Sequence, residues 1–150
     1  MDLDPVARLV AIEEIKQLKA RYFRGMDQRR FDDVMAPVFA RDAHLDADGF
    51  TADGRDGIIA FLKRVLADAR TVHHGHMPEI TVTSPTTAHG IWAMFDYVEF
   101  TAPDTSDGSR VGLHGYGHYE EDYVVEDGAW RIANLRLTRL RVDPLPGTAG

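Results

Sequence analysis

A few polar side chains stand where the surrounding pattern would otherwise place apolar residues. Asp27 follows the apolar stripe of the first predicted helix, one turn beyond Phe23 and on a partly buried face. Further along, the chain carries His73, His74 and His76, and in an extended segment His73 points away from the other two. An imidazole ionises near neutral pH, so it is a suitable group to remove a proton from carbon. The residue types alone equally allow a turn aspartate that bonds its own backbone and histidines with structural roles.

A metal site is an alternative use of the histidines. His74 and His76 would share one strand face, and so would His114 and His118. The His-x-His spacing is similar to the start of a cupin motif, but the glutamate at the expected separation is missing. The long first helix is also wrong for a cupin. We therefore predict no bound metal.

Asp96 is a charged residue in the middle of an apolar strand pattern. It shares a predicted face with Trp92, Met94, Val98 and Phe100. A buried carboxylate must be paired, hydrogen-bonded or protonated, because an isolated buried charge is too costly. Arg136 is the candidate partner, since alternation places it on a face of the last predicted strand that starts apolar and becomes polar. A purely structural Asp96/Arg136 bridge would satisfy the same pattern.

Glycines and serines give no other catalytic signal. Gly115 and Gly117 lie inside a strand pattern, with neither the lysine nor the helix that a phosphate loop requires. We expect them to permit strong sheet curvature. The few serines lie in turn-like contexts, which does not favour serine hydrolase chemistry.

Composition narrows the classes of partner. The chain has 17 basic and 24 acidic residues, a net charge of −7 and no cysteine. A negative chain is a poor partner for nucleic acid or an anionic membrane surface, and disulfides, thiolate chemistry and ordinary structural zinc sites are excluded. Neither a signal peptide nor a membrane-spanning run of roughly 20 apolar residues is evident. We expect a cytoplasmic protein that binds neither nucleic acid nor membrane.

The chemistry-bearing residues must be positioned by three helical segments followed by strands. Apolar residues at helical spacing predict a helix from about Pro5 to Met26, a second helical pattern over 31–39 and a third over 58–66, with a short strand at 42–46 between the last two.

From Thr71 onward the period is two, and strands are predicted over 79–83, 88–101, 112–125 and 130–142. Turn-like sequences separate them at 84–87, 103–108 and 126–128. This order predicts the α+β class, in which three N-terminal helices pack on a strongly curved, mostly antiparallel sheet. One domain is expected over 1–143, with a flexible tail over 144–150.

The whole set of signals resembles one family. The segments 11–18, 21–23 and 26–27 look like its first helix, Thr71 to Gly75 like its histidine strand, and Gly128 to Ile132 like its last hairpin. On these residues the chain resembles the SnoaL-like (polyketide-cyclase-like) branch of the nuclear-transport-factor-2-like superfamily. That branch includes scytalone dehydratase and bile-acid dehydratase, and its fold is a cone-shaped α+β barrel.

The resemblance implies a function and a set of site residues. Asp27 and His73 would form an Asp–His dyad, and Tyr22, Asp96 and Arg136 fall at places that match further catalytic groups of the bile-acid dehydratases. The implied activity is a cofactor-independent dehydratase, a lyase acting on a hydrophobic small molecule, with polycyclic and steroid-like molecules among the expected substrates. Five further residues are expected to contact the substrate or to shape its pocket: Trp92, Met94, His76, Tyr116 and His118.

Other members of the superfamily supply alternatives. A ketosteroid or polyketide type of isomerase or cyclase would use the same pocket, with Asp27 as the base if His73 pointed elsewhere. A non-catalytic ligand-binding or subunit-type member would share only the fold. Because open cones expose part of their sheet, we expect a homo-oligomer, either a trimer or a dimer.

Overall fold

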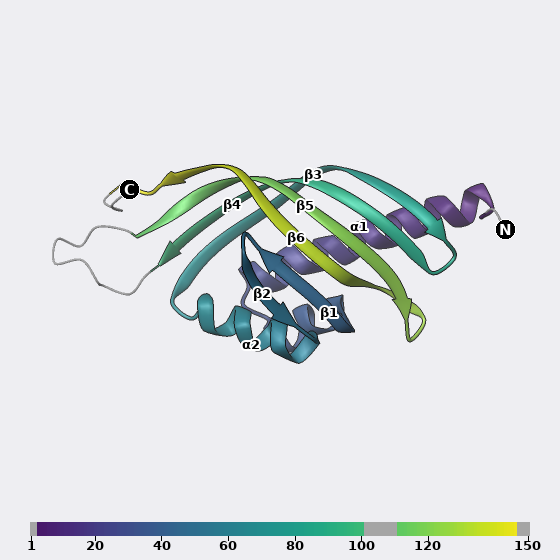
Figure 1. Ribbon diagram of the computed structural model, residues 1–150, viewed down its shortest axis with the longest axis horizontal. Helices are drawn as coiled ribbons and strands as arrows, with labels where there is room; N and C mark the ends of the chain where they lie inside the picture. Colours follow the sequence, from purple (N-terminus) through teal and green to yellow (C-terminus); the bar gives the residue numbers. More distant parts are fainter. Residues whose placement is uncertain (1–2, 101–110, 147–150) are drawn as a thin grey trace.

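A long first helix lies against the concave face of a curved sheet (Figure 1). In this computed structural model the described residues are 3–100 and 111–146. Helix α1 spans Pro5–Asp27, and its first turn is capped by Asp4, whose side chain accepts a hydrogen bond from the backbone N–H of Ala7. Its buried residues recur at helical spacing: Ala11, Ile15, Leu18, Lys19, Tyr22, Gly25 and Met26. The predicted helix is confirmed and ends one residue later than expected.

The next segment carries both helical and extended elements. A π-helical turn (Phe31–Met35) and a 3-10 turn (Ala36–Val38) lead into strand β1 (Phe39–Ala47). Strand β2 (Phe50–Asp53) pairs with β1 through a tight hairpin that the sequence analysis did not predict. Helix α2 (Arg55–Val65) follows and confirms the third predicted helix.

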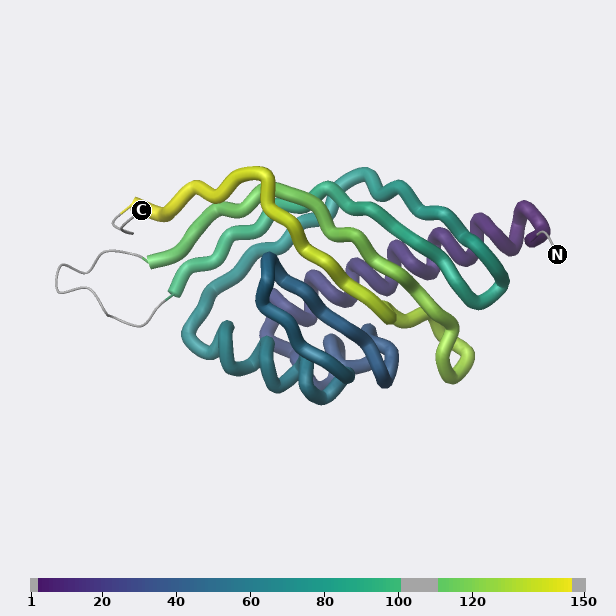
Figure 2. Tube along the Cα trace, viewed as in Figure 1, coloured from purple at the N-terminus to yellow at the C-terminus, as the bar shows by residue number. Residues whose placement is uncertain are grey.

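Four long strands form most of the sheet, and Figure 2 shows them running side by side. They are β3 (Ala69–Ser84), β4 (Thr87–Phe100), β5 (Val111–Glu126) and β6 (Ala129–Pro144). The order of the described strands is β2-β1-β6-β5-β4-β3, and among them only the β1–β6 contact is parallel. The predicted α+β class with a mostly antiparallel sheet is confirmed. The predicted turn at 103–108 lies outside the described residues.

Strand β6 contains two irregularities that decide which of its side chains face the helices. Its pairing with β5 skips Ala133 and, further on, Leu140. An extra residue in one strand reverses the side-chain alternation beyond it. The inward series therefore runs from Ile132 to Leu135, Leu137 and Arg139.

The predicted tail begins inside ordered structure. Strand β6 continues to Pro144, and the backbone N–H of Leu145 donates to the carbonyl of Gly112 at 3.0 Å. The Leu145 side chain is buried. Residues 147–150 lie outside the described part of the chain.

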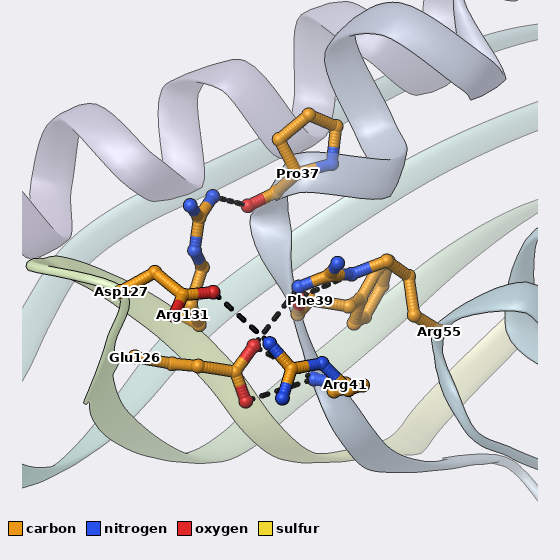
Figure 3. Close-up of polar contacts among 7 residues, drawn as sticks. All are labelled: Pro37, Phe39, Arg41, Arg55, Glu126, Asp127 and Arg131. Carbon is orange, nitrogen blue, oxygen red and sulfur yellow. Dashed lines mark hydrogen bonds and ion pairs between the residues drawn. The ribbon is translucent and has the colours of Figure 1, made fainter.

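A charged cluster joins helix α2 to two distant parts of the sheet (Figure 3). Arg55 donates from Nε to the carbonyl of Phe39 at 2.9 Å and from its guanidinium to Glu126 at 3.0 Å. The carboxylate of Glu126 also accepts from the backbone N–H of Arg41 at 3.0 and 3.1 Å. The beginning of α2 is thereby fixed to β1 and to the β5–β6 turn.

Among the described helices, none combines the length and apolar character needed to cross a bilayer.

Candidate active site

A cavity of about 290 Å³ opens between helix α2, the C-terminal end of α1 and the inner face of the sheet. This is the lower end of the usual range of roughly 300–1,000 Å³ for ligand pockets. Helix α2 and the residue after it supply only apolar wall, namely Phe61, Leu62, Val65 and Leu66. The polar groups of the lining come from the other elements: Tyr22, His73, Asp96, Tyr119 and Arg139.

Asp27 and His73 form a hydrogen-bonded pair at this cavity. The imidazole Nδ1 lies 2.7 Å from Asp27 Oδ1, and the backbone N–H of His73 donates to Oδ2 at 2.9 Å. A carboxylate on Nδ1 favours the tautomer that keeps a proton there, so Nε2 is the ring nitrogen left to accept a proton. His73 lines the cavity, whereas Asp27 does not appear among its lining residues. This arrangement suits a histidine base oriented by a carboxylate.

Burial distinguishes this pair from two others in the described residues. His44–Asp53 and His89–Asp122 have similar Nδ1–oxygen distances, 2.6 and 2.9 Å. Their histidines are 45% and 46% exposed, against 8% for His73. Hydrogen bonding of a histidine to an aspartate is therefore common in this molecule. Only the shielded pair has the water-poor surroundings in which such contacts gain electrostatic strength.

The end of α1 is fixed by contacts that the sequence analysis did not identify. The Thr71 hydroxyl donates to Asp27 Oδ1 at 2.9 Å, a third hydrogen bond to that carboxylate. Arg29, in a left-handed backbone conformation with φ of 59°, donates to the carbonyls of Leu66, Ala67 and Ala69 at 2.5, 2.7 and 3.1 Å. The guanidinium thereby ties the connection between α2 and β3 to the helix that carries Asp27.

Arg139, and not Arg136, is the partner of Asp96. The guanidinium of Arg139 donates to Asp96 Oδ2, and the aspartate is only 2% exposed. Arg136 lies exposed on the outer face of β6. The prediction of Arg136 was wrong because it assumed unbroken alternation, which the extra residue at Ala133 reverses.

Gly115 provides the space for this ion pair. A Cβ at that position would lie 2.0 Å from Asp96 Oδ1 and 2.7 Å from Arg139 Nε. We expect Gly115→Ala to displace both side chains and to lower the free energy of unfolding by about 1–3 kcal/mol, the usual cost of overpacking. Urea denaturation measures the change.

Gly57→Ala is the matched control for that substitution. Gly57 lies within α2, and nothing lies within 4 Å of the Cβ it would gain. Alanine is the better helix former by roughly 1 kcal/mol, so this variant should be as stable as the parent or more so. Equal stabilities for Gly115→Ala and the parent would contradict the assigned role of Gly115.

Two tyrosines complete the polar end of the cavity. The rings of Tyr22 and Tyr119 meet edge to face at 5.9 Å between centroids. Burial is the main cause that raises the pKa of each phenol above its ordinary value. Both therefore stay protonated and can donate hydrogen bonds. Asp96 Oδ1 and Arg139 Nε have no hydrogen-bond partner among the described residues and lie buried beside Gly115.

The five residues expected to contact substrate lie elsewhere. Trp92 and Met94 are buried on the inner face of β4 but belong to the core and do not line the cavity. His76 and Tyr116 are exposed on the outer face, and His118 shares that face. Strand β5 turns Tyr119 inward, so the prediction chose the wrong face of that strand.

The histidines outside the dyad do not gather around a potential metal position. His74 and His76 pack their rings edge to face at 6.0 Å between centroids, and His74 also contacts Phe95. Within residues 3–100 and 111–146, no group of three or more histidine or acidic side chains has the geometry to hold an ion.

Comparison with protein families gives one match over most of the chain. A family model described as a SnoaL-like domain matches residues 7–136.

Solved structures share the fold over nearly the full length. A type 2 hexachlorocyclohexane dehydrochlorinase (LinA) superposes with a TM-score of 0.82 at 21% identity, covering 98% of this chain and 97% of its own. A putative scytalone dehydratase from Novosphingobium aromaticivorans gives 0.78 at 22% identity, with 95% and 97% covered. A protein of unknown function from Mycobacterium tuberculosis gives 0.73 at 25% identity, with 89% and 73% covered.

Proposed function

Because the chain belongs to the SnoaL-like domain family, we propose that it is a lyase that eliminates a small leaving group from a hydrophobic substrate, with His73 as base. The observation that carries the proposal is the 2.7 Å contact between His73 Nδ1 and Asp27 Oδ1 beside a largely apolar cavity. In the proposed step, Nε2 takes a proton from a substrate carbon. The C–H electron pair becomes a carbon–carbon double bond, and the leaving group departs from the adjacent carbon with its bonding electrons.

The other polar groups have defined parts in this proposal. Tyr22 would donate a hydrogen bond to a substrate oxygen as negative charge develops there, and donors already in position can contribute several kcal/mol. The carboxylate of Asp27 would stabilise the imidazolium that forms and keep the ring oriented. The Asp96–Arg139 pair would bind a polar end of the substrate. None of these steps calls for an external cofactor.

The size of the cavity bears on the substrate. The described residues line about 290 Å³ of open space, close to the lower end of the usual range for ligand pockets, which favours a small substrate. The relatives suggest probes, since one is named for hexachlorocyclohexane and another for scytalone. The leaving group would be chloride in a cyclic chloride and hydroxide in a cyclic alcohol. A panel of cyclic chlorides and alcohols of this size is therefore the first assay.

An isomerase that uses Asp27 as its base is the second candidate. It is less well supported, because Asp27 accepts three hydrogen bonds and does not line the cavity. The products distinguish the two, since an isomerase releases nothing and a lyase releases chloride or water.

Asp27→Asn tests the dyad. An amide cannot stabilise the imidazolium and can favour the wrong tautomer, so we expect kcat to fall by about 10²–10⁴-fold. Steady-state turnover on the best substrate of the panel is the measurement. Asp122→Asn is the matched control, because Asp122 makes the same contact with His89 in the open and its loss should leave kcat unchanged. Full activity in Asp27→Asn would remove the dyad from the proposal.

A further inference from the structure

A lysine charge is enclosed directly behind the two tyrosines of the cavity. The side chain of Lys19 is fully buried, and its ammonium lies 3.8 Å from the ring centroid of Tyr22 and 3.7 Å from that of Tyr119. Lys19 is absent from the cavity lining, whereas both tyrosines are part of it. The two rings thus contact the ammonium and also line the cavity.

Glu121 on β5 holds the ammonium in place. Lys19 donates to Glu121 Oε1, and the hydroxyl of Tyr123 donates to Oε2 at 2.5 Å. The indole N–H of Trp92 in turn donates to the Tyr123 hydroxyl at 2.9 Å. Each charged group of the pair thus has a partner inside the core, which is the condition for burying charge at tolerable cost. Burial lowers the pKa of Lys19 to about 8 against the opposing effect of Glu121, so the lysine is charged at neutral pH.

The surroundings of the tyrosines otherwise make them weak donors. Burial raises the pKa of Tyr22 and Tyr119, and the negative charges of Glu121 and Asp96 raise both further. The other charged or titratable side chains near the rings are Asp27, whose charge also raises the pKa of Tyr22, and His73 and Arg139, which line the cavity. A cation on the face of each ring acts in the opposite sense, because it stabilises negative charge drawn onto the phenol oxygen.

We propose that Lys19 is a positioning residue whose enclosed ammonium strengthens Tyr22 and Tyr119 as hydrogen-bond donors to an oxygen bound in the cavity. The identification of this oxygen as part of a reacting substrate rests on the proposed function. The effect of the lysine charge on the two hydroxyls is independent of the proposed function. If Lys19 were uncharged, Glu121 would act on both rings unopposed and the donors would weaken.

The test uses two ligands and needs no turnover. Wild type and the double variant Lys19→Met/Glu121→Gln, which keeps the core neutral and of similar volume, are titrated with 4-nitrophenolate and with 4-nitrotoluene. Only the first offers an anionic oxygen. We expect the preference for 4-nitrophenolate to fall by about threefold to tenfold in the double variant, because the lost cation–ring contact is partly offset by removal of the Glu121 charge that opposed it. Affinity for 4-nitrotoluene should not change, which shows that the cavity is intact.

A second comparison shows whether the charge acts through the hydroxyls. The variant Tyr22→Phe/Tyr119→Phe has no hydroxyl donors. Adding Lys19→Met/Glu121→Gln to it should therefore leave the preference for 4-nitrophenolate over 4-nitrotoluene unchanged. An equal preference in wild type and in Lys19→Met/Glu121→Gln would overturn the proposal, and so would an undiminished effect without the hydroxyls. Absence of turnover would count only against the lyase, since these measurements concern binding.

Discussion

Replacing His73 by glutamine is expected to lower kcat by about 10²–10⁴-fold, the range that one positioned acid–base group contributes. Glutamine keeps a polar side chain of similar reach but has no nitrogen that can take a proton at neutral pH. Binding should change little, because the apolar walls and the hydroxyl donors remain. Initial rates and the affinity for a product or inert analogue provide the two readouts.

His89→Gln is the control for that variant. His89 bonds Asp122 through Nδ1 as His73 bonds Asp27, but it lies 46% exposed on the sheet. Its turnover should match the parent. A different pattern, in which His73→Gln stays active and Asp27→Asn does not, would identify the carboxylate as the base and favour the isomerase.

Lys19→Met alone is expected to lower the free energy of unfolding by about 3–5 kcal/mol, because it leaves Glu121 buried without its counter-ion. The companion Glu121→Gln substitution should restore most of the loss, since it removes the second charge as well. Urea denaturation of the two variants measures the difference. Equal stabilities for the single and double variants would show that the ion pair is not closed off as described.

The pH dependence of the free energy of unfolding is the control for this prediction, because it reports the charge of Lys19 directly. Burial lowers the pKa of Lys19 to about 8 in the folded chain from 10.5. Between these values the unfolded chain binds the proton and the folded chain does not, so this lysine makes stability rise with pH over that interval. Above pH 10.0, the ordinary pKa of tyrosine, the raised pKa of Tyr22 acts in the opposite direction. The rise from pH 8 toward 10 should be absent in Lys19→Met.

The architecture was predictable because its signals are long and periodic. The first helix carries apolar residues every three or four positions over 23 residues, so its existence and buried face follow from spacing alone. The late strands alternate and are separated by turn residues. Strand β2 was missed because it spans only four residues and alternates too briefly to be recognised.

The candidate site was predictable where alternation is regular and not beyond a bulge. Tyr22, His73 and Asp96, which the family resemblance placed in the site, all line the cavity, and their catalytic roles stay a prediction. Arg139 was missed because the position of the extra residue in β6 depends on pairing with β5, which no local pattern in the sequence records. Thr71 carries no local signal either, since its role depends on the end of a helix 44 residues earlier.

The burial of Lys19 was predictable from its position in the apolar stripe of the first helix. It falls within the buried stripe of α1, four residues after Ile15 and three before Tyr22, and a charge there is as anomalous as Asp96 in its strand. Long basic side chains usually extend from such stripes to reach water, which makes the position easy to overlook. Only the packing of β5 over the helix shows that this one is enclosed.

Helix α2 supplies the cavity with hydrocarbon and nothing else, whereas every ionisable or hydroxyl group of the lining comes from another element. Part of the apolar wall is thus set by a stretch of chain that carries none of the polar groups of the lining. Resizing Phe61 or Val65 should exchange one set of acceptable molecules for another while the proton-transfer apparatus stays in place. Helix α2 is therefore the segment to randomise when the aim is to change the substrate range and keep the polar groups in place.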